Sequence, residues 1–380
     1  MKRFFFSVVV FFALIEPSIS AEDEIVLPLE GDNTLSAGFG FYFQNDQPEH
    51  TGGNPKLDED EFVFEGIIML DKSLSERDRL NVRVLGDIVS SASQMRYHNP
   101  QFRALQANPS GNKHLAADVG YIHNFEALNF GSHAGFGFEA NEFYSWLYGL
   151  NVAVPLMDNN TTLSVRFDGF TDYFHIKSFD GTMPGYSMRQ TFTPEINLLQ
   201  VLSPLDLVNF NLSYTVQFGM LETTYYSVFV ADIEHSEKMP AERHRSSIAG
   251  RWKHSLSSEN TIEVGYRFYL DTWKLYSHTA ELRFFQYLYF KQLLLEPSVR
   301  FYTQTGAEFF QREFDILPLY RSSDSDLGPF TGALFGLRLA LIEMPFFPVG
   351  INELSIGAHY WLRNDGMMIY WFDLGYLFRF

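Results

Sequence analysis

Carboxylate and guanidinium side chains share one face in three neighbouring segments of the C-terminal third, where they stand two or four residues apart. The residues are Glu263, Arg267 and Asp271, then Glu281 and Arg283, then Glu296 and Arg300. If these segments are adjacent strands, opposite charges attract across them and form a ladder that stiffens a wall. The same groups would also suit a constriction that selects solutes by charge, as rings of charged side chains do in pores. The sequence leaves both interpretations open.

Histidines are the candidate catalytic groups, because a hydrolase needs a base beside a nucleophile or an activated water. His278 lies between Ser277 and Thr279, and His359 precedes the segment that carries Asp373. Neither histidine has a convincing triad or histidine–carboxylate arrangement. We therefore expect no enzyme and assign no catalytic residue.

Two acidic clusters, 58–61 and 324–326, could attract hard cations through their oxygen atoms. Neither cluster has a complete calcium-loop spacing, and solvated loops are the favoured interpretation. The sequence also contains no zinc spacing and no glycine-rich phosphate loop after a strand. We expect no metal and no cofactor.

The composition narrows the class of protein. The chain has 380 residues and a formal net charge of −18, so it lacks the basic surface that nucleic-acid binding requires. It contains no cysteine, which excludes disulfides, thiolate metal sites and a cysteine nucleophile. Aromatic residues reach 17% of the chain, yet the mean hydropathy is only −0.11. A chain that alternates apolar and polar residues gives both values.

The clearest alternation lies at 208–219. Every second residue from Val208 to Phe218 is large and apolar, and the residues between them are Asn, Ser, Thr, Gln or Gly. Successive side chains of a strand point to opposite faces, whereas a helix would scatter these polar groups round its surface. The period of two therefore predicts a strand.

The same pattern predicts an all-β protein, a transmembrane antiparallel β-barrel of about 16 strands. The strands are expected at 36–45, 61–71, 79–89, 114–124, 128–138, 143–154, 162–173, 188–200, 207–219, 246–256, 261–271, 275–285, 291–303, 330–342, 352–363 and 367–380. Pro194 and Pro297 lie inside two of them, and each removes a donor from the ladder, so we expect a bulge at each proline.

The lengths of the connections support a barrel independently. Every connection after an even-numbered strand is short. The connections after odd-numbered strands include all the long ones, at 46–60, 90–113, 174–187, 220–245 and 304–329. This parity predicts short periplasmic turns at one end of the barrel and longer extracellular loops at the other.

The two ends of the chain predict export and insertion. Residues 1–21 have the charged start, the apolar stretch and the small-residue exit of a signal peptide. Residues 22–35 then form a periplasmic N-terminal segment, and 36–380 form the barrel. The last strand alternates large apolar residues to the end of the chain. Its Tyr376, Phe378 and Phe380 look like the signal read by the barrel assembly machinery.

Two segments carry a resemblance to a known family. Tyr266 to Trp273 read Tyr-Arg-Phe-Tyr-Leu-Asp-Thr-Trp, and Glu296 to Gln304 read Glu-Pro-Ser-Val-Arg-Phe-Tyr-Thr-Gln. They resemble a bacterial family of predicted outer-membrane β-barrels that is classed as a domain of unknown function. Its members carry Tyr-Arg-x-Tyr-x-Asp-x-Trp and Glu-Pro-x-x-Arg-x-Tyr-x-Gln segments. The resemblance implies an outer-membrane barrel and brings no established activity.

The likeness is firm over residues 260–310 and looser elsewhere. Phe268 stands where a tyrosine is usual, and Glu308 and Phe310 stand where aspartate and tyrosine are expected. These departures weaken any claim about a specific loop site, but they do not affect the fold.

Projected onto the inner face of a barrel, the charged residues define a lumen. The predicted lumen-lining residues are Arg83, Asp87, Arg166, Asp168, Glu263, Arg267, Asp271, Glu281, Arg283, Glu296, Arg300, Tyr302 and Arg363. On the lipid face each arginine would cost about 2–4 kcal/mol at mid-depth. A sixteen-stranded wall can enclose water. The leading functional hypothesis is therefore a passive, porin-like channel for small polar solutes in the cell outer membrane.

Two other functions stay open. One is a non-conducting scaffold or adhesin that presents the loops 90–113, 220–245 and 304–329; the other, less favoured, is an outer-membrane hydrolase. The expected partners are outer-membrane lipid and lipopolysaccharide, the barrel assembly machinery during insertion, and a small-solute permeant, with no nucleic acid.

Aromatic residues near the strand ends are expected mostly to form girdles at the membrane interfaces. They are Tyr42, Tyr144, Trp146, Tyr148, Trp252, Trp273, Tyr276, Tyr287, Tyr289, Trp361, Tyr370 and Trp371.

Overall fold

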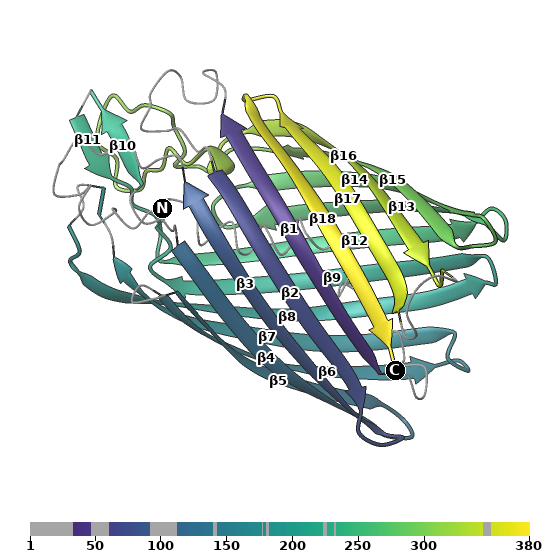
Figure 1. Cartoon of the computed structure of the whole chain (residues 1–380). Coiled ribbons are helices and arrows are strands. Elements are labelled where there is room, and N and C mark those ends of the chain that lie inside the picture. Colours follow the sequence, from purple (N-terminus) through teal and green to yellow (C-terminus); the bar gives the residue numbers. More distant parts are fainter. Residues whose placement is uncertain are drawn as a thin grey trace.

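Sixteen antiparallel strands close into one barrel in the computed structural model of this chain (Figure 1). The structure describes residues 33–46, 61–91, 112–139, 143–176, 178–179, 182–222, 226–231, 233–344 and 351–380. The predicted signal peptide and the predicted N-terminal segment up to residue 32 lie outside these ranges.

The strand count and the fold class are confirmed, because each predicted strand overlaps one strand of the barrel. The barrel strands are β1 (Thr34–Asp46), β2 (Glu61–Ser73), β3 (Asp78–Ser91), β4 (Asn112–Asn124), β5 (Asn129–Glu139), β6 (Phe143–Leu156), β7 (Thr161–Ile176), β8 (Gly185–Ser203), β9 (Asp206–Gly219), β12 (Glu242–Ser255), β13 (Asn260–Asp271), β14 (Tyr276–Leu288), β15 (Leu293–Gln304), β16 (Phe330–Ile342), β17 (Ile351–Arg363) and β18 (Met367–Arg379). Two further strands, β10 (Ser227–Val230) and β11 (Ile233–Ser236), pair with each other outside the barrel.

Each barrel strand pairs with its neighbours in the chain, and β9 pairs with β12 across the segment that holds β10 and β11. The barrel closes where β1 pairs with β18 along its whole length; Figure 1 shows these two strands side by side, in purple and yellow. A closed sheet has no unpaired edge, so every strand satisfies its backbone groups within the wall.

The alternation at 208–219 takes the form that the sequence predicts. On β9, Phe210 and Leu212 point outward and are 53% and 51% exposed. Ser213 points inward, and its hydroxyl lies 2.7 Å from that of Ser247 on β12. The outward face is apolar and the inward face carries hydrogen-bonding groups, as a barrel in lipid requires.

The described connections also follow the pattern that the sequence predicts, with the long ones all at one end of the barrel. Short turns join β2 to β3, β4 to β5, β6 to β7, β8 to β9, β12 to β13 and β14 to β15 at one end, which we call the periplasmic end. The long connections that contain β10 and β11, and that join β15 to β16, lie at the opposite, outer end (Figure 1).

The expected bulges at Pro194 and Pro297 are wrong. Pro194 pairs with Phe167, and Pro297 pairs with Leu337. The registers of β8 with β9 and of β14 with β15 are the same on both sides of each proline. Each ladder loses the pairs beside its proline without gaining an extra residue, because the pyrrolidine ring removes a donor but does not lengthen the strand.

In the part of the chain that the structure describes, no helix is long and apolar enough to cross a membrane.

Candidate functional site

The predicted lumen-lining residues all lie on barrel strands, where each stands next to an exposed apolar residue of the other face. The residues lie on β3 (Arg83, Asp87), β7 (Arg166, Asp168), β13 (Glu263, Arg267, Asp271), β14 (Glu281, Arg283), β15 (Glu296, Arg300, Tyr302) and β17 (Arg363). The structure brings them together in separate groups rather than in one ring.

The ladder on β13, β14 and β15 forms one of these groups. Arg283 lies between Glu263 and Glu296, with its Nη1 3.4 Å from the Glu263 carboxylate and its Nε 3.0 Å from that of Glu296. Arg300 lies 3.2 Å from Glu281. These side chains are 5–19% exposed, so salt screens the pairs less than it screens pairs on a surface.

The ladder extends further than the sequence indicates. Arg338 on β16 lies 3.3 Å from Glu296 and also contacts Glu353 on β17. Glu296 and Arg338 are directly opposite each other in the register of β15 and β16. Alternation places both residues on the inner face, but only the register makes them partners.

Further ion pairs line the strands from β2 to β8. They join Arg79 to Asp71, Arg83 to Asp118 at 2.6 Å, Arg166 to Asp168 at 2.7 Å and Arg189 to Asp172 at 3.0 Å. Arg267 on β13 makes no ion pair with any residue that the structure describes, and its guanidinium lies 5.9 Å from the centre of the Tyr269 ring.

A row of acidic and imidazole groups, interrupted by one glycine, runs across six strands of the facing wall, and it contains no lysine or arginine. Its members, from β18 through β1, β2, β3 and β4 to β5, are consecutive register partners: Asp373, Gly40, Glu65, Asp87, His114 and Glu139. We call this set the carboxylate row. Its carboxylates are only 4–9% exposed. Of these residues the sequence predicted Asp87 alone as a site residue, since only the register shows that the others lie beside it.

The predicted aromatic girdles are wrong at several positions. Tyr42, Tyr287, Trp361 and Trp371 face inward, and Trp273 is buried under the outer loops. Tyr42, Trp361 and Trp371 belong to an inward apolar cluster completed by Val63, Phe330, Leu334, Met367, Ile369 and Tyr302. The reason is parity, because Trp371 stands two residues from the inward Asp373 and therefore shares its face.

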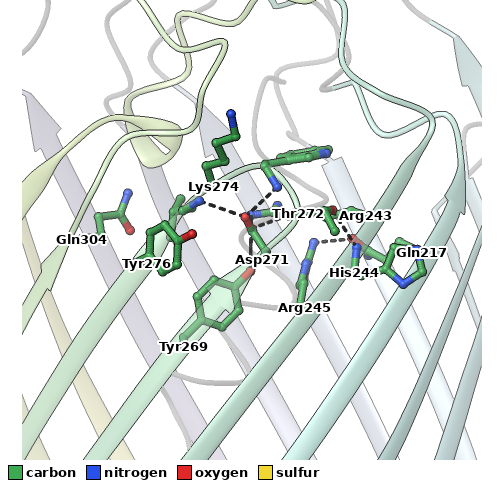
Figure 2. A network of polar contacts seen from close by, with 12 residues as sticks. Gln217, Arg243, His244, Arg245, Tyr269, Asp271, Thr272, Lys274, Tyr276 and Gln304 are labelled. Atoms are coloured by element: carbon green, nitrogen blue, oxygen red, sulfur yellow. Dashed lines mark hydrogen bonds and ion pairs between the residues drawn. The ribbon is translucent and has the colours of Figure 1, made fainter.

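Asp271 is the centre of a polar network at the outer end of β13 (Figure 2). Its carboxylate accepts hydrogen bonds from Arg243 Nε at 2.8 Å and from the Tyr269 hydroxyl at 2.9 Å. It also accepts the backbone N–H groups of Trp273 at 2.9 Å and Leu275 at 3.0 Å. The Asp271 side chain is fully buried, and the Arg243 guanidinium lies 4.0 Å from the centre of the Trp273 ring. The first of the two segments that resemble the family, Tyr266 to Trp273, thus builds the turn between β13 and β14.

The second of these segments, Glu296 to Gln304, anchors an outer loop. Gln304 donates to the backbone oxygens of Asp326 at 2.8 Å and Gly328 at 2.6 Å, and it accepts from the Tyr302 hydroxyl at 2.6 Å. Arg363 donates to the Asp326 carboxylate at 2.6 Å. Gln304 and Arg363 face inward, so the short 3-10 helix η2 (Ser325–Leu327) lies on the inner side of the rim.

The described parts of two of the long outer loops, those after β9 and β15, pack together, and we call residues 221–222, 226–231, 233–241 and 305–328 the outer cap. Val230 bridges to Phe314 and Lys238 to Arg321. Trp273 lies in an apolar cluster with Leu221, Met239, Leu275, Ala307 and Leu327. The loop predicted at 220–245 therefore contacts the other long loop.

The acidic cluster at 324–326 supports the outer cap. Asp324 accepts the backbone N–H of Asp326 at 2.9 Å at the start of η2, and Asp326 pairs with Arg363. Residues 58–60 of the other acidic cluster lie outside the described ranges. Among the residues described, no three histidine, aspartate or glutamate side chains are placed to hold a metal ion.

The two candidate histidines have different surroundings. His359 is buried in the inner wall, with its Nε2 2.9 Å from Asp373 and its ring stacked on Trp371 at 4.7 Å. Sequence reasoning missed this histidine–carboxylate pair. His278 lies on the outward face, 2.6 Å from the Tyr266 hydroxyl. No serine or threonine hydroxyl described in the structure bonds to either ring, so neither histidine forms a nucleophile–base pair there.

The three residues expected to direct insertion lie on one side of β18. The rings of Phe378 and Phe380 stack with centres 5.6 Å apart, and Tyr376 precedes them on the same face. Phe380 is 56% exposed and donates its backbone N–H to Asn33 at 3.0 Å.

The family model described as "Protein of unknown function (DUF3570)" matches residues 142–365 of this chain. The matched range includes both motif segments, with Asp271 and Gln304. A comparison with curated proteins finds no match.

Solved structures show the same kind of barrel. A bacterial polysaccharide outer membrane secretin matches with a TM-score of 0.52 and 8% identity, over 92% of this chain and 98% of the other. CdiB from Acinetobacter baumannii matches with a TM-score of 0.50 and 8% identity, over 90% and 60%. The siderophore receptor PirA from Acinetobacter baumannii matches with a TM-score of 0.45 and 10% identity; 86% of this chain aligns, and it spans 52% of PirA. At such identities the likeness shows the fold alone.

Proposed function

Because the chain belongs to the DUF3570 family of proteins of unknown function, whose description names no activity, we propose its function from the barrel itself: a passive, porin-like channel for small polar solutes. The observation that carries the proposal is the polar inner wall. Charged side chains line the ladder strands, the strands from β2 to β8 and the carboxylate row, whereas the outward face is apolar. A wide barrel lined in this way suits water and dissolved ions.

The arrangement of charge supports selection among solutes. In the strand order, β2 and β3 lie across the ring from β12 and β13. The inward positions of the first pair carry Glu65, Asp71 and Asp87 against Arg79 and Arg83, so their net charge is negative. Those of the second pair carry Arg243, Arg245, Arg251, Lys253 and Arg267 against Glu263 and Asp271, so their net charge is positive. Walls of opposite charge create a field across the lumen that orients polar solutes as they pass.

In this proposal the outer cap narrows the opening of the barrel. Its segment at 325–328 lies inside the rim and is held there by Gln304 and Arg363. A loop fixed to the inner wall narrows the opening without closing the barrel, so it sets an upper size for permeant solutes.

The location belongs to the same proposal. The peptide at 1–21 would direct export, and the barrel assembly machinery would read Tyr376, Phe378 and Phe380 in the last strand. The apolar outward face would then contact outer-membrane lipid and lipopolysaccharide.

Conductance measurements test the channel. Purified, folded protein is added to planar lipid bilayers in potassium chloride, and we expect stepwise, ohmic single-channel currents. Arg363→Ala should raise the unit conductance, because it releases Asp326 from the inner wall. Arg77→Ala is the matched control, since Arg77 is 59% exposed in a periplasmic turn, and it should leave the conductance unchanged. A folded sample that never conducts would rule the channel out.

A second candidate is a non-conducting scaffold that presents the outer cap. The observation that favours it is a group of exposed apolar side chains, Ile316, Leu317 and Leu319, which are 79%, 52% and 67% exposed. Exposed apolar groups of this kind mark interaction sites. Protease treatment of intact cells, scored for loss of binding to a partner surface, separates the two candidates when combined with the conductance result.

A further inference from the structure

We propose that the carboxylate row binds an extended organic cation of the linear polyamine class. The inference rests on the proposed channel for the route of entry, because the row faces the lumen. The binding groups are Glu65, Asp87 and Asp373, on β2, β3 and β18.

These three carboxylates lack the partners that buried charges need. Glu65 is 9% exposed and makes no hydrogen bond or ion pair with any described residue. Asp87 and Asp373 each use one oxygen on a histidine, at 3.2 Å and 2.9 Å, and their other oxygens are buried without a partner in the structure described. Ionised carboxylates only accept hydrogen bonds, so the missing partner is a donor with positive charge.

No lysine or arginine side chain that the structure describes pairs with Glu65, Asp87 or Asp373. Glu65 and Asp87 are direct register partners, and like charges in that position repel. The two arginines of β3 pair elsewhere: Arg79 contacts Asp71, and Arg83 lies 2.6 Å from Asp118.

The spacing of the carboxylates favours an elongated ligand over a single metal ion. Neighbouring strands lie about 4.8 Å apart, so Glu65 and Asp87 are one step apart, whereas Glu65 and Asp373 are two steps apart, about 10 Å. Gly40 stands between the latter two and puts no side chain in the way. The described carboxylates and histidines do not converge on one point, as metal coordination would require. A linear chain of amines can lie across the strands and place its ammonium groups along the row.

Aromatic rings border the row on its outer side. Tyr42 and Trp371 are register partners, and each stands two residues along its strand from a member of the row, Gly40 or Asp373. Trp361 belongs to the same inward cluster. Aromatic faces attract organic cations and pack against their methylene groups. Carboxylates beside aromatic rings therefore match the two parts of an alkyl polyamine.

Spermidine binding tests the proposal. The full chain, folded in detergent micelles, is titrated with spermidine at low salt in a calorimeter, and we expect saturable binding. Glu65→Gln and Asp373→Asn should each weaken the affinity about tenfold, because each removes one charge-assisted contact. Glu281→Gln is the matched control, since this inward carboxylate already pairs with Arg300. It should bind spermidine like the unchanged protein.

The outcomes separate this site from the channel. No binding of spermidine, or binding by both row variants with the affinity of the unchanged protein, overturns the site. Calcium binding that depends on Glu65 and that spermidine does not compete with overturns the polyamine assignment. The assay needs no bilayer, so binding without conductance retains the site and refutes the channel, whereas conductance without binding refutes the site. If one row variant does not fold, as judged by heat-modifiable migration on a gel, the other decides.

Discussion

At the scale of the residue, the same chemical group has different roles at different depths in the barrel. Asp271 belongs by type and spacing to the charged face of β13, but its carboxylate accepts hydrogen bonds from four residues and is fully buried. Such a group holds structure in place, because a buried carboxylate with all its acceptors filled has none left for a solute. Glu65 has the opposite character, since it is buried without a partner among the described residues.

Replacing Asp271 should loosen the outer cap. Asp271→Asn leaves Arg243 buried without its counter-charge, so we expect the protein to lose about 3–5 kcal/mol of unfolding free energy in urea. Residues 221–241 and 305–328 should also become sensitive to protease while the barrel stays intact.

The control for Asp271 is an exposed pair in the same region. Lys274 and Glu308 are 62% and 58% exposed, so Glu308→Gln should change the stability by at most about 1 kcal/mol. If both variants resist protease like the unchanged protein, the proposed role of Asp271 in the outer cap is wrong.

At the scale of the element, each barrel strand separates lipid from lumen through its alternation. The outward residues of β9 are half exposed, whereas the inward residues bond across to their neighbours, as Asn209 does with Asn197 at 2.9 Å. A charged side chain is therefore tolerated on one face and costly on the other, at positions a single residue apart.

Two adjacent substitutions on β9 measure this difference. Leu212→Arg places a guanidinium in lipid and should cost about 2–4 kcal/mol, whereas Asn211→Arg places it in the lumen and should cost much less. The measurement is urea unfolding of protein folded in lipid vesicles. Equal costs for the two variants would contradict the assigned faces of the strand.

At the scale of the whole molecule, closure depends on the last strand. β18 pairs with β17 on one side and with β1 on the other, so the barrel has no closed wall until the C-terminal residues are in place. The stacked rings of Phe378 and Phe380 stand at this seam, on the outward face.

Changing the terminal residue should therefore impair assembly more than stability. Phe380→Ala should lower the amount of folded barrel in the outer membrane severalfold, because it removes the end of the proposed insertion signal. Once folded, the variant should unfold in urea like the unchanged protein, since Phe380 is 56% exposed. Fractionation of cell envelopes with heat-modifiable migration on gels gives the readout. Normal assembly of this variant would remove Phe380 from the signal.

The sixteen strands, the parity of the loops and the residues of each strand that share a face could all be predicted from the sequence. These follow from a period of two, which is a local property of neighbouring residues. Which of these residues contact one another depends on the folded barrel. Sequence alternation puts Glu65, Asp87 and Asp373 on one face, but only the register across β18, β1, β2 and β3 makes them a row. The inward aromatics and the docking of the outer cap on Gln304 and Arg363 depend in the same way on contacts between distant segments, which no local pattern encodes.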